Sequence, residues 1–262
     1  MINKYFKTIA LCSALLMFLI GACKQDEYFL DGGKSDPKFN GNVLQYLESN
    51  PSKFDTLVRV IRIAGLEDLF SNEEITFFAP TDEVFRRTIG QVNRQSQFGD
   101  DPYVNKLNQE LFSAGRDTIA NFEDVPAEIW RKYLLRYVFK GKMRLRDYPQ
   151  LDFRLRQLYP GGYFYTYERE LANIGVVFNS ANGVRYAGSR QISISYLPDP
   201  SNPEAIQSAA VATSDVQPSN GVVHVLAVYA GTEFIDELRL DRQASDNFGF
   251  NKEFNIDVVL NR

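Results

Sequence analysis

The sequence has few of the residues that most often build metal centres and enzyme active sites. It contains two cysteines, Cys12 and Cys23, and one histidine, His224. Cys12 falls in a leader that we expect to be removed, so no disulfide, Cys-based zinc site or Cys nucleophile is available to the mature chain. A single histidine without a motif-borne nucleophile does not make a catalytic triad. We therefore expect no metal site, no cofactor and no enzymatic turnover.

The sequence also lacks an excess of positive charge. It carries 29 Lys and Arg against 33 Asp and Glu, which gives a net charge of −4. Proteins that bind nucleic acids concentrate positive charge to contact phosphates, so we expect no nucleic-acid partner. The same balance gives no attraction to an anionic membrane surface. Any association with a membrane should therefore come from a lipid anchor.

The N-terminus has the pattern of an export leader. Two lysines precede an apolar run from Ile9 to Ala22. A basic start, a short apolar run and small residues at its end are typical of a secretory signal, and a spanning helix would need about 20 apolar residues. Ile20-Gly-Ala-Cys23 resembles the bacterial lipobox, in which the cysteine is lipidated and becomes the new N-terminus. We expect residues 1–22 to be removed and Cys23 to be lipidated; the alternative is a plain secretory peptide.

The residues after Cys23 indicate where the protein is located in the cell. Lys24-Gln-Asp-Glu27 resembles the signal that sends lipoproteins of Bacteroidetes-type bacteria to the outer face of the outer membrane; a solvated tether is the alternative. Residues 23–39 are polar and contain Gly32-Gly33, which is typical of a flexible linker. We therefore expect a tethered, lipid-anchored protein of the outer membrane that faces the cell exterior.

The first half of the remaining chain alternates helical and strand patterns. A short helix is predicted from Asn42 to Ser49, and Pro51 ends it. A second helix follows, with Ser52 as a plausible cap. It has an apolar stripe at helical spacing: Phe54, Leu57, Val58 and Ile61. The apolar run 75–79 predicts a buried strand, and Thr81 is placed to cap a following helix. Residues 91–125 indicate an insertion with weak helical content, and Pro126 begins a further helix that closes at Gly141.

The second half is rich in strand patterns. Strands are predicted at 163–167, 175–178, 184–186, 191–196 and 222–229, with a hairpin turn at Asn182-Gly183. In the tail, 232–262, a last strand is predicted from apolar residues that alternate with polar ones: Phe254, Ile256, Val258 and Leu260. These patterns predict an α+β fold with one domain over 40–231, interrupted by insertions, and a C-terminal extension over 232–262.

Three segments resemble the fasciclin domain family. Ile75-Thr-Phe-Phe-Ala-Pro-Thr-Asp-Glu-Val-Phe85 is similar to the first family signature, and Asn220-Gly-Val-Val-His-Val225 is similar to the second. Between them, Tyr133-Leu-Leu-Arg-Tyr-Val-Phe-Lys-Gly141 resembles the central family segment. The resemblance covers about residues 40–231, and it implies a compact wedge of strands wrapped by helices that works in adhesion or partner binding. Where the family commonly has Tyr-His, this chain has Arg136-Tyr137, so we assign no receptor contact to that pair.

Few residues suggest a site. Tyr163, Tyr165 and Tyr167 share one face of a predicted strand, so they could form an aromatic platform for a sugar ring or a partner surface; ordinary cross-strand packing is the favoured alternative. His224 lies between two valines, which favours a buried core histidine. We interpret three carboxylate pairs as solvated surface, since nothing indicates a glycosidase site: Glu73-Glu74, Asp100-Asp101 and Asp236-Glu237.

The leading hypothesis is a non-enzymatic surface lipoprotein that binds a glycan, peptide or protein, as adhesion modules do. The alternative hypothesis is an accessory subunit of an outer-membrane import complex for glycans or peptides, docked to a transporter and its lid lipoprotein. In that case the docking elements would be the insertion 91–125 and the tail 232–262. An enzyme is the third hypothesis, because fold alone does not determine function.

Overall fold

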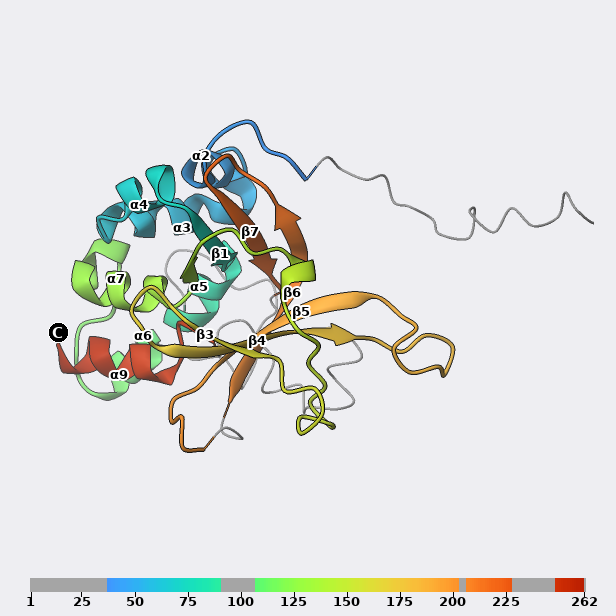
Figure 1. Cartoon of the computed structure of the whole chain (residues 1–262). Coiled ribbons are helices and arrows are strands. Elements are labelled where there is room, and N and C mark those ends of the chain that lie inside the picture. Colours follow the sequence, from blue (N-terminus) through green and yellow to red (C-terminus); the bar gives the residue numbers. More distant parts are fainter. Residues whose placement is uncertain (1–36, 91–106, 203–205, 228–247, 262) are drawn as a thin grey trace, which may run out of the picture. The chain divides into compact units, whose positions relative to one another are not determined.

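In the computed structural model, which describes residues 37–90, 107–202, 206–227 and 248–261, a seven-stranded sheet carries helices packed to one side (Figure 1). The sheet has the order β2-β1-β7-β6-β5-β4-β3. Strands β1 and β7 are parallel and all other neighbours are antiparallel. The strands are β1 (Ile75–Ala79), β2 (Val138–Lys140), β3 (Gly162–Tyr165), β4 (Leu171–Phe178), β5 (Arg190–Tyr196), β6 (Gln207–Val216) and β7 (Gly221–Leu226).

The two outermost strands of this order approach one another, so the sheet is nearly closed. The N–H of Tyr167, just beyond β3, donates to the carbonyl of Val138 in β2 over 2.8 Å. Unpaired backbone groups at a sheet edge are a liability that proteins usually cover or close. This contact removes part of both edges and brings the β3–β4 turn next to the end of helix α7.

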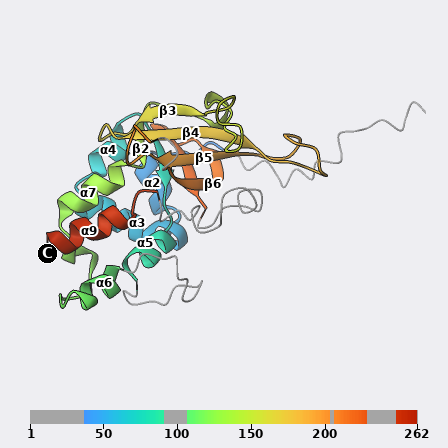
Figure 2. The same cartoon turned by 90° about the horizontal axis from the view of Figure 1, so that it is seen from below.

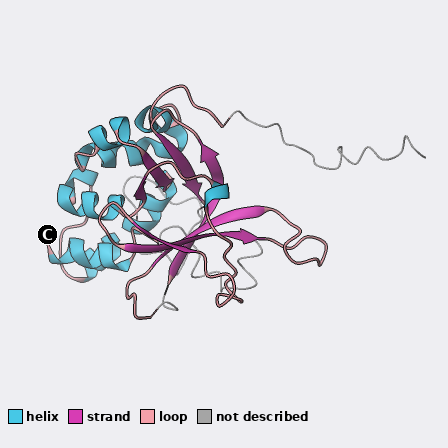
Figure 3. Ribbon diagram, viewed as in Figure 1, coloured by secondary structure: helices cyan, strands magenta, loops and turns pink. Residues whose placement is uncertain are grey.

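The helices gather on one side of the sheet, while β4 and β5 extend away from them (Figures 2 and 3). They are α2 (Val43–Glu48), α3 (Pro51–Ile63), α4 (Glu67–Asn72), α5 (Asp82–Ile89), α6 (Leu107–Ser113), α7 (Ala127–Leu135) and α9 (Lys252–Leu260). Single turns of 3₁₀-helix lie at Phe122–Asp124 and Leu145–Asp147. The expected α+β class is confirmed, and the helical prediction for the insertion holds for residues 107–125.

Helix α3 shows how the apolar spacing determines the packing. All four residues of the predicted stripe are buried, and the helix ends before Gly65, whose φ of +63° suits glycine. Helix α2 ends before Pro51, as predicted, but Ser52 is wrong as the cap of α3. Pro51 occupies the first turn of α3, where its missing N–H costs nothing, and Asn50 stands at the N-cap.

The predicted turn in the β4–β5 hairpin is confirmed, but its predicted second strand is wrong. Asn182 and Gly183 have φ of +51° and +77°, and the flanking Ala181 and Val184 exchange two backbone hydrogen bonds. Both positive φ values are those that a two-residue hairpin turn requires. Residues 184–186 nevertheless lie in a loop, because regular pairing ends at Phe178 opposite Arg190.

The predicted last strand is also wrong, since its residues form α9. Phe254 and Val258 are buried on one side of this helix, while Ile256 and Leu260 are exposed on the other. Residues two apart share one face of a strand but point in nearly opposite directions on a helix, so the helix divides the four apolar residues between a buried and an exposed side. The side chain of Asn251 caps the first turn by accepting from the N–H of Glu253.

The predicted helix from Pro126 stops before Gly141. Helix α7 ends at Leu135, and residues 138–140 leave it to form β2, which pairs with β1. The apolar side chains expected on this helix are buried: Ile129, Trp130, Tyr133, Leu134 and Tyr137. Trp130 lies at the centre of a core of aromatic rings from α5, α7 and the C-terminal segment: Phe85, Phe250 and Phe254.

Candidate functional site

Two of the three predicted platform tyrosines point into solvent from β3. Tyr163 is 49% exposed and Tyr165 is 70% exposed, while Phe164 between them packs edge-on against Tyr148 in the interior. Period-two alternation along β3 therefore places the two rings on the outer face, as the sequence predicts.

Tyr167 is not part of this exposed pair. It lies beyond the end of β3, is partly buried against the core, and has the Lys140 ammonium 5.2 Å from its ring centre. Its backbone closes the sheet onto Val138. The exposed aromatic surface of β3 is therefore made by Tyr163 and Tyr165.

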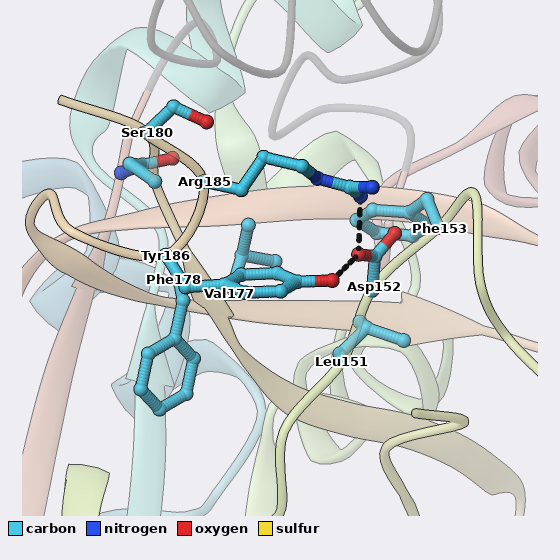
Figure 4. Close-up of a pocket in the computed structure, with 9 residues that line it drawn as sticks. Leu151, Asp152, Phe153, Val177, Phe178, Ser180, Arg185 and Tyr186 are labelled. Atoms are coloured by element: carbon cyan, nitrogen blue, oxygen red, sulfur yellow. Dashed lines mark hydrogen bonds and ion pairs between the residues drawn. The ribbon is translucent and has the colours of Figure 1, made fainter. Parts of the chain in front are cut away.

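A hollow of about 30 Å³ opens where the β4–β5 hairpin meets the segment 151–153 (Figure 4). We call it the hairpin pocket. Aliphatic, aromatic, acidic, basic and amide side chains line it: Leu151, Asp152, Phe153, Val177, Phe178, Asn179, Ser180, Arg185 and Tyr186. Its volume holds one or two water molecules or the polar end of a larger ligand.

Asp152 organises the hairpin pocket. One carboxylate oxygen accepts from the backbone N–H groups of Arg154 and Leu155, and the other accepts from Arg185 Nη2 at 3.1 Å and from the Tyr186 hydroxyl at 2.7 Å. Burial opposes the charged form of Asp152, but these donors outweigh it and hold the pKa below its ordinary value. The carboxylate is therefore ionised and fixes the hairpin to the 151–155 segment.

The hairpin presents an aromatic wall beside this carboxylate. Tyr186 has φ of +64°, a left-handed conformation that is rare for a bulky residue. Its ring meets that of Tyr159 edge-on, with centroids 6.1 Å apart. Strained backbone of this kind persists where the surroundings hold it, and here the bond to Asp152 does so.

His224 is confirmed as a buried core histidine. It is fully buried, its Nδ1 accepts from the N–H of Asp215 at 3.2 Å, and its Nε2 lies 3.0 Å from the carbonyl of Met143. These partners define a neutral ring that carries its proton on Nε2. Burial lowers the pKa of His224 to about 4, so the ring stays neutral at neutral pH.

Arg136 and Tyr137, where the chain departs from the usual Tyr-His pair, are both buried. The Arg136 guanidinium lies between the rings of Tyr133 and Tyr196, 4.4 and 4.3 Å from their centres, and forms ion pairs with Glu170 and Glu253. The Tyr137 hydroxyl accepts from the N–H groups of Gly249 and Phe250. The pair therefore holds the C-terminal segment in place.

The remaining predicted residues give no further site. Glu73 and Glu74 are exposed, and Glu74 pairs with Lys142 at 2.8 Å. Cys23, residues 24–36 of the tether and the other two carboxylate pairs lie outside the described residues. The last tether residues are described, and Pro37 and Phe39 form backbone hydrogen bonds with Gln217. Across the described ranges, no three acidic, His or Cys side chains gather as metal ligands. Within those same ranges, no helix combines the length and the apolar character that a bilayer span requires.

Sequence reasoning missed most of the hairpin pocket. The Asn182-Gly183 turn signals a hairpin that brings residues before and after it together. Nothing in the sequence indicates that Asp152 contacts Arg185 and Tyr186, which follow it by 33 and 34 residues.

Comparison with known proteins agrees with the signature segments. Residues 52–228 match the family model described as the fasciclin domain. Among solved structures, the chain is similar to a FAS1 domain pair from the insect cell adhesion molecule fasciclin I, at 20% identity and a TM-score of 0.42. That match covers 71% of this chain and 49% of the insect chain, so this chain spans about half of its length. No curated protein matches. The family match extends over more than half of the sequence, and the chain belongs to the fasciclin domain family.

Proposed function

We propose that this protein is a non-enzymatic binding or adhesion module, displayed on the outer face of an outer membrane by acyl chains on Cys23. Fasciclin domains are adhesion-type modules, and the family indicates no catalytic activity. The leader pattern before Cys23 supports the anchor, and the polar residues after it support a tether.

The distribution of exposed apolar side chains carries this proposal. Seven large apolar residues are exposed in the described ranges, and four of them come from one stretch, 158–184. Two of these four, Tyr163 and Tyr165, lie next to each other on one face of β3. Exposed apolar residues that cluster, rather than scatter, mark binding surfaces. Tyrosine suits such a surface, because its ring offers apolar area and its hydroxyl remains available for hydrogen bonds.

Two measurements test the proposal. The full-length protein and its Cys23→Ser variant are expressed in a Gram-negative host, and we expect the first in the outer-membrane fraction, labelled by radioactive fatty acid, and the variant in neither. The mature domain is then screened on arrays of glycans, peptides and matrix proteins. Blank arrays, or turnover of a glycan or ester without stable binding, would contradict a binding module.

A second function, as an accessory subunit of a nutrient import complex, is favoured by a separate observation. The other three exposed apolar residues are Phe112 on α6 and Ile256 and Leu260 on α9. The two helices pack against each other. Helix α6 belongs to the expected insertion 91–125, and α9 lies beyond the residues that match the family model. Such a paired surface is suited to docking a larger protein.

Mild detergent extraction separates the two functions. A transporter that co-purifies with the wild type, and is lost from Ile256→Glu with Leu260→Glu, supports the subunit role. The matched control is Tyr163→Glu with Tyr165→Glu, which places the same two charges at comparably exposed sites on β3. Purification of the wild type alone supports a free binding module.

A further inference from the structure

The outer edge of β3 is left without a partner strand. β3 is the last strand in the order of the sheet, and within the described ranges it pairs with β4 alone. The hydrogen bond from the N–H of Tyr167 to the carbonyl of Val138 closes the sheet just beyond the end of β3. Residues 163–165 therefore lie on an edge that remains open, and Tyr163 and Tyr165 are exposed there.

The backbone groups of two residues face this open edge. The N–H of Thr166 donates to the carbonyl just before β4, whereas the N–H of Tyr167 donates to Val138 on the opposite side. Successive residues of an antiparallel strand direct their N–H and C=O groups to alternate sides. The backbone groups of Tyr163 and Tyr165 therefore point away from β4, toward the side on which Val138 lies.

Within its four described residues, β3 carries none of the devices that protect an open edge. Natural proteins block such edges with proline, charged side chains, a bulge or a covering segment. β3 reads Gly-Tyr-Phe-Tyr, and its pairing with β4 is regular over all four residues. Its exposed side chains are the two tyrosine rings, which offer apolar area and hydroxyl groups to a partner. The edge is therefore suited to accept another strand.

We propose that the outer edge of β3 binds an extended segment of an acidic partner polypeptide as an added strand, an inference that rests on the protein being a binding module. N–H and C=O groups that repeat at every second residue match an extended polypeptide backbone, and main-chain hydrogen bonds give added strands their affinity. Tyr163 and Tyr165 lie on one face of β3, where they contact alternate side chains of the added strand.

The charge beside this edge indicates which polypeptide binds. Residues 138–170, which include β2, β3 and the segment between them, contain seven Lys and Arg and four Asp and Glu, in a chain whose net charge is −4. Lys140 is exposed, and its ammonium lies 5.2 Å from the ring centre of Tyr167, next to the place where the edge opens. Pairing of β3 with β3 of a second copy would bring two positive segments together, so the charge favours an acidic partner.

The first test uses a random peptide library displayed on phage and the protein purified in mild detergent. We expect the enriched peptides to be acidic. Synthetic copies of the best peptide are then methylated at one amide nitrogen at a time. Methylation at alternate positions should weaken binding by about tenfold or more, because it removes donors that face β3 and leaves tyrosine carbonyls unpaired. Methylation at the positions between them should leave binding unchanged, because those amides face away from β3.

The second test blocks the edge in the protein with Tyr165→Pro. Proline lacks the N–H that points away from β4, and an edge strand tolerates it because no hydrogen bond of the ladder is lost. The matched control is Tyr165→Thr, which loses the same ring but keeps the N–H. We expect the proline variant to bind about tenfold more weakly than this control, with unchanged circular dichroism. Should the proline variant fold poorly, the methylation pattern on the wild type decides alone.

Several results would overturn the inference. They are equal binding by the proline variant and its control, methylation effects that do not alternate, enriched peptides without an excess of acidic residues, and a homodimer that Tyr165→Pro abolishes. A protein that binds only glycans would also overturn it, while the proposed function stands. Failure of every glycan, peptide and matrix protein to bind would contradict both.

Discussion

His224 should make the protein lose stability as the pH falls from about 6.5 to about 4. Burial lowers the pKa of His224 from its ordinary 6.5 to about 4 in the folded chain. Within this window the unfolded chain binds a proton at His224 and the folded chain does not. Stability must therefore be complete above about pH 6.5 and decrease with falling pH, until the folded ring also titrates.

The magnitude follows from the size of the shift. Each pKa unit corresponds to about 1.4 kcal/mol, so a shift of this size contributes about 3 kcal/mol. The structure gives the cause, because a protonated ring would have to be charged while fully buried, and Nδ1 would lose its role as acceptor for the N–H of Asp215. Asp152, Asp257 and Glu123 also have lowered pKa values, and their contributions begin to decline near pH 5. A variant that lacks only the histidine keeps these contributions and so isolates that of His224.

Two assays measure the effect. His224 is the only histidine, so its imidazole gives one set of NMR signals whose titration in the folded domain needs no assignment by mutation. Urea unfolding at about pH 7 and about pH 4.5 measures the stability difference, with His224→Gln as the control that lacks the titrating ring. An NMR midpoint near 6.5, or the same pH dependence in the control, would refute the reasoning.

Three further predictions concern stability, measured by urea unfolding. Arg136→Ala should lower the free energy of unfolding by about 3 kcal/mol, since it leaves the carboxylates of Glu170 and Glu253 without their buried cation. A decrease below about 1 kcal/mol would show that solvent replaces the guanidinium. Gly249→Ala should release the segment 248–261 to proteolysis, because the added Cβ would overlap the Tyr137 ring. Protection equal to that of the wild type would refute this. Asn220→Ala should lower the free energy of unfolding by about 2–3 kcal/mol, because it removes three hydrogen bonds: one from the N–H of Val43 and two to the carbonyls of Phe70 and Glu73. The control is Asn72→Ala on the surface of α4, which should lower it far less.

The sequence predicted best where one local pattern decided the structure. The stripe from Phe54 to Ile61, the run 75–79 and the residues 222–226 each have an apolar spacing that suits one kind of element, and each forms that element. The Asn182-Gly183 turn is of the same kind, because few residues adopt two successive positive φ values. The exposure of Tyr163 and Tyr165 follows from the strand period once Phe164 is assigned to the core.

The errors occurred where tertiary contacts decide between local alternatives. Residues 252–260 alternate like a strand but form α9, because Phe254 and Val258 can pack together on one side of a helix against Trp130 and its neighbours. Residues 138–140 continue a helical pattern but form β2, because they pair with β1, which lies far earlier in the chain. The contact of Asp152 with the hairpin is likewise a long-range one that no local pattern indicates.

The segments that identify the family are not the ones that can recognise a ligand. Every residue of β1 and β7, which form the parallel centre of the sheet, is buried, as are Arg136 and Tyr137 in the central segment. These residues determine the fold, and buried side chains cannot contact a partner. The exposed apolar and polar groups lie instead on β3, the β4–β5 hairpin and the α6–α9 pair. Membership of the fasciclin family therefore explains the framework, while the proposed binding function has to rest on exposed groups outside these segments.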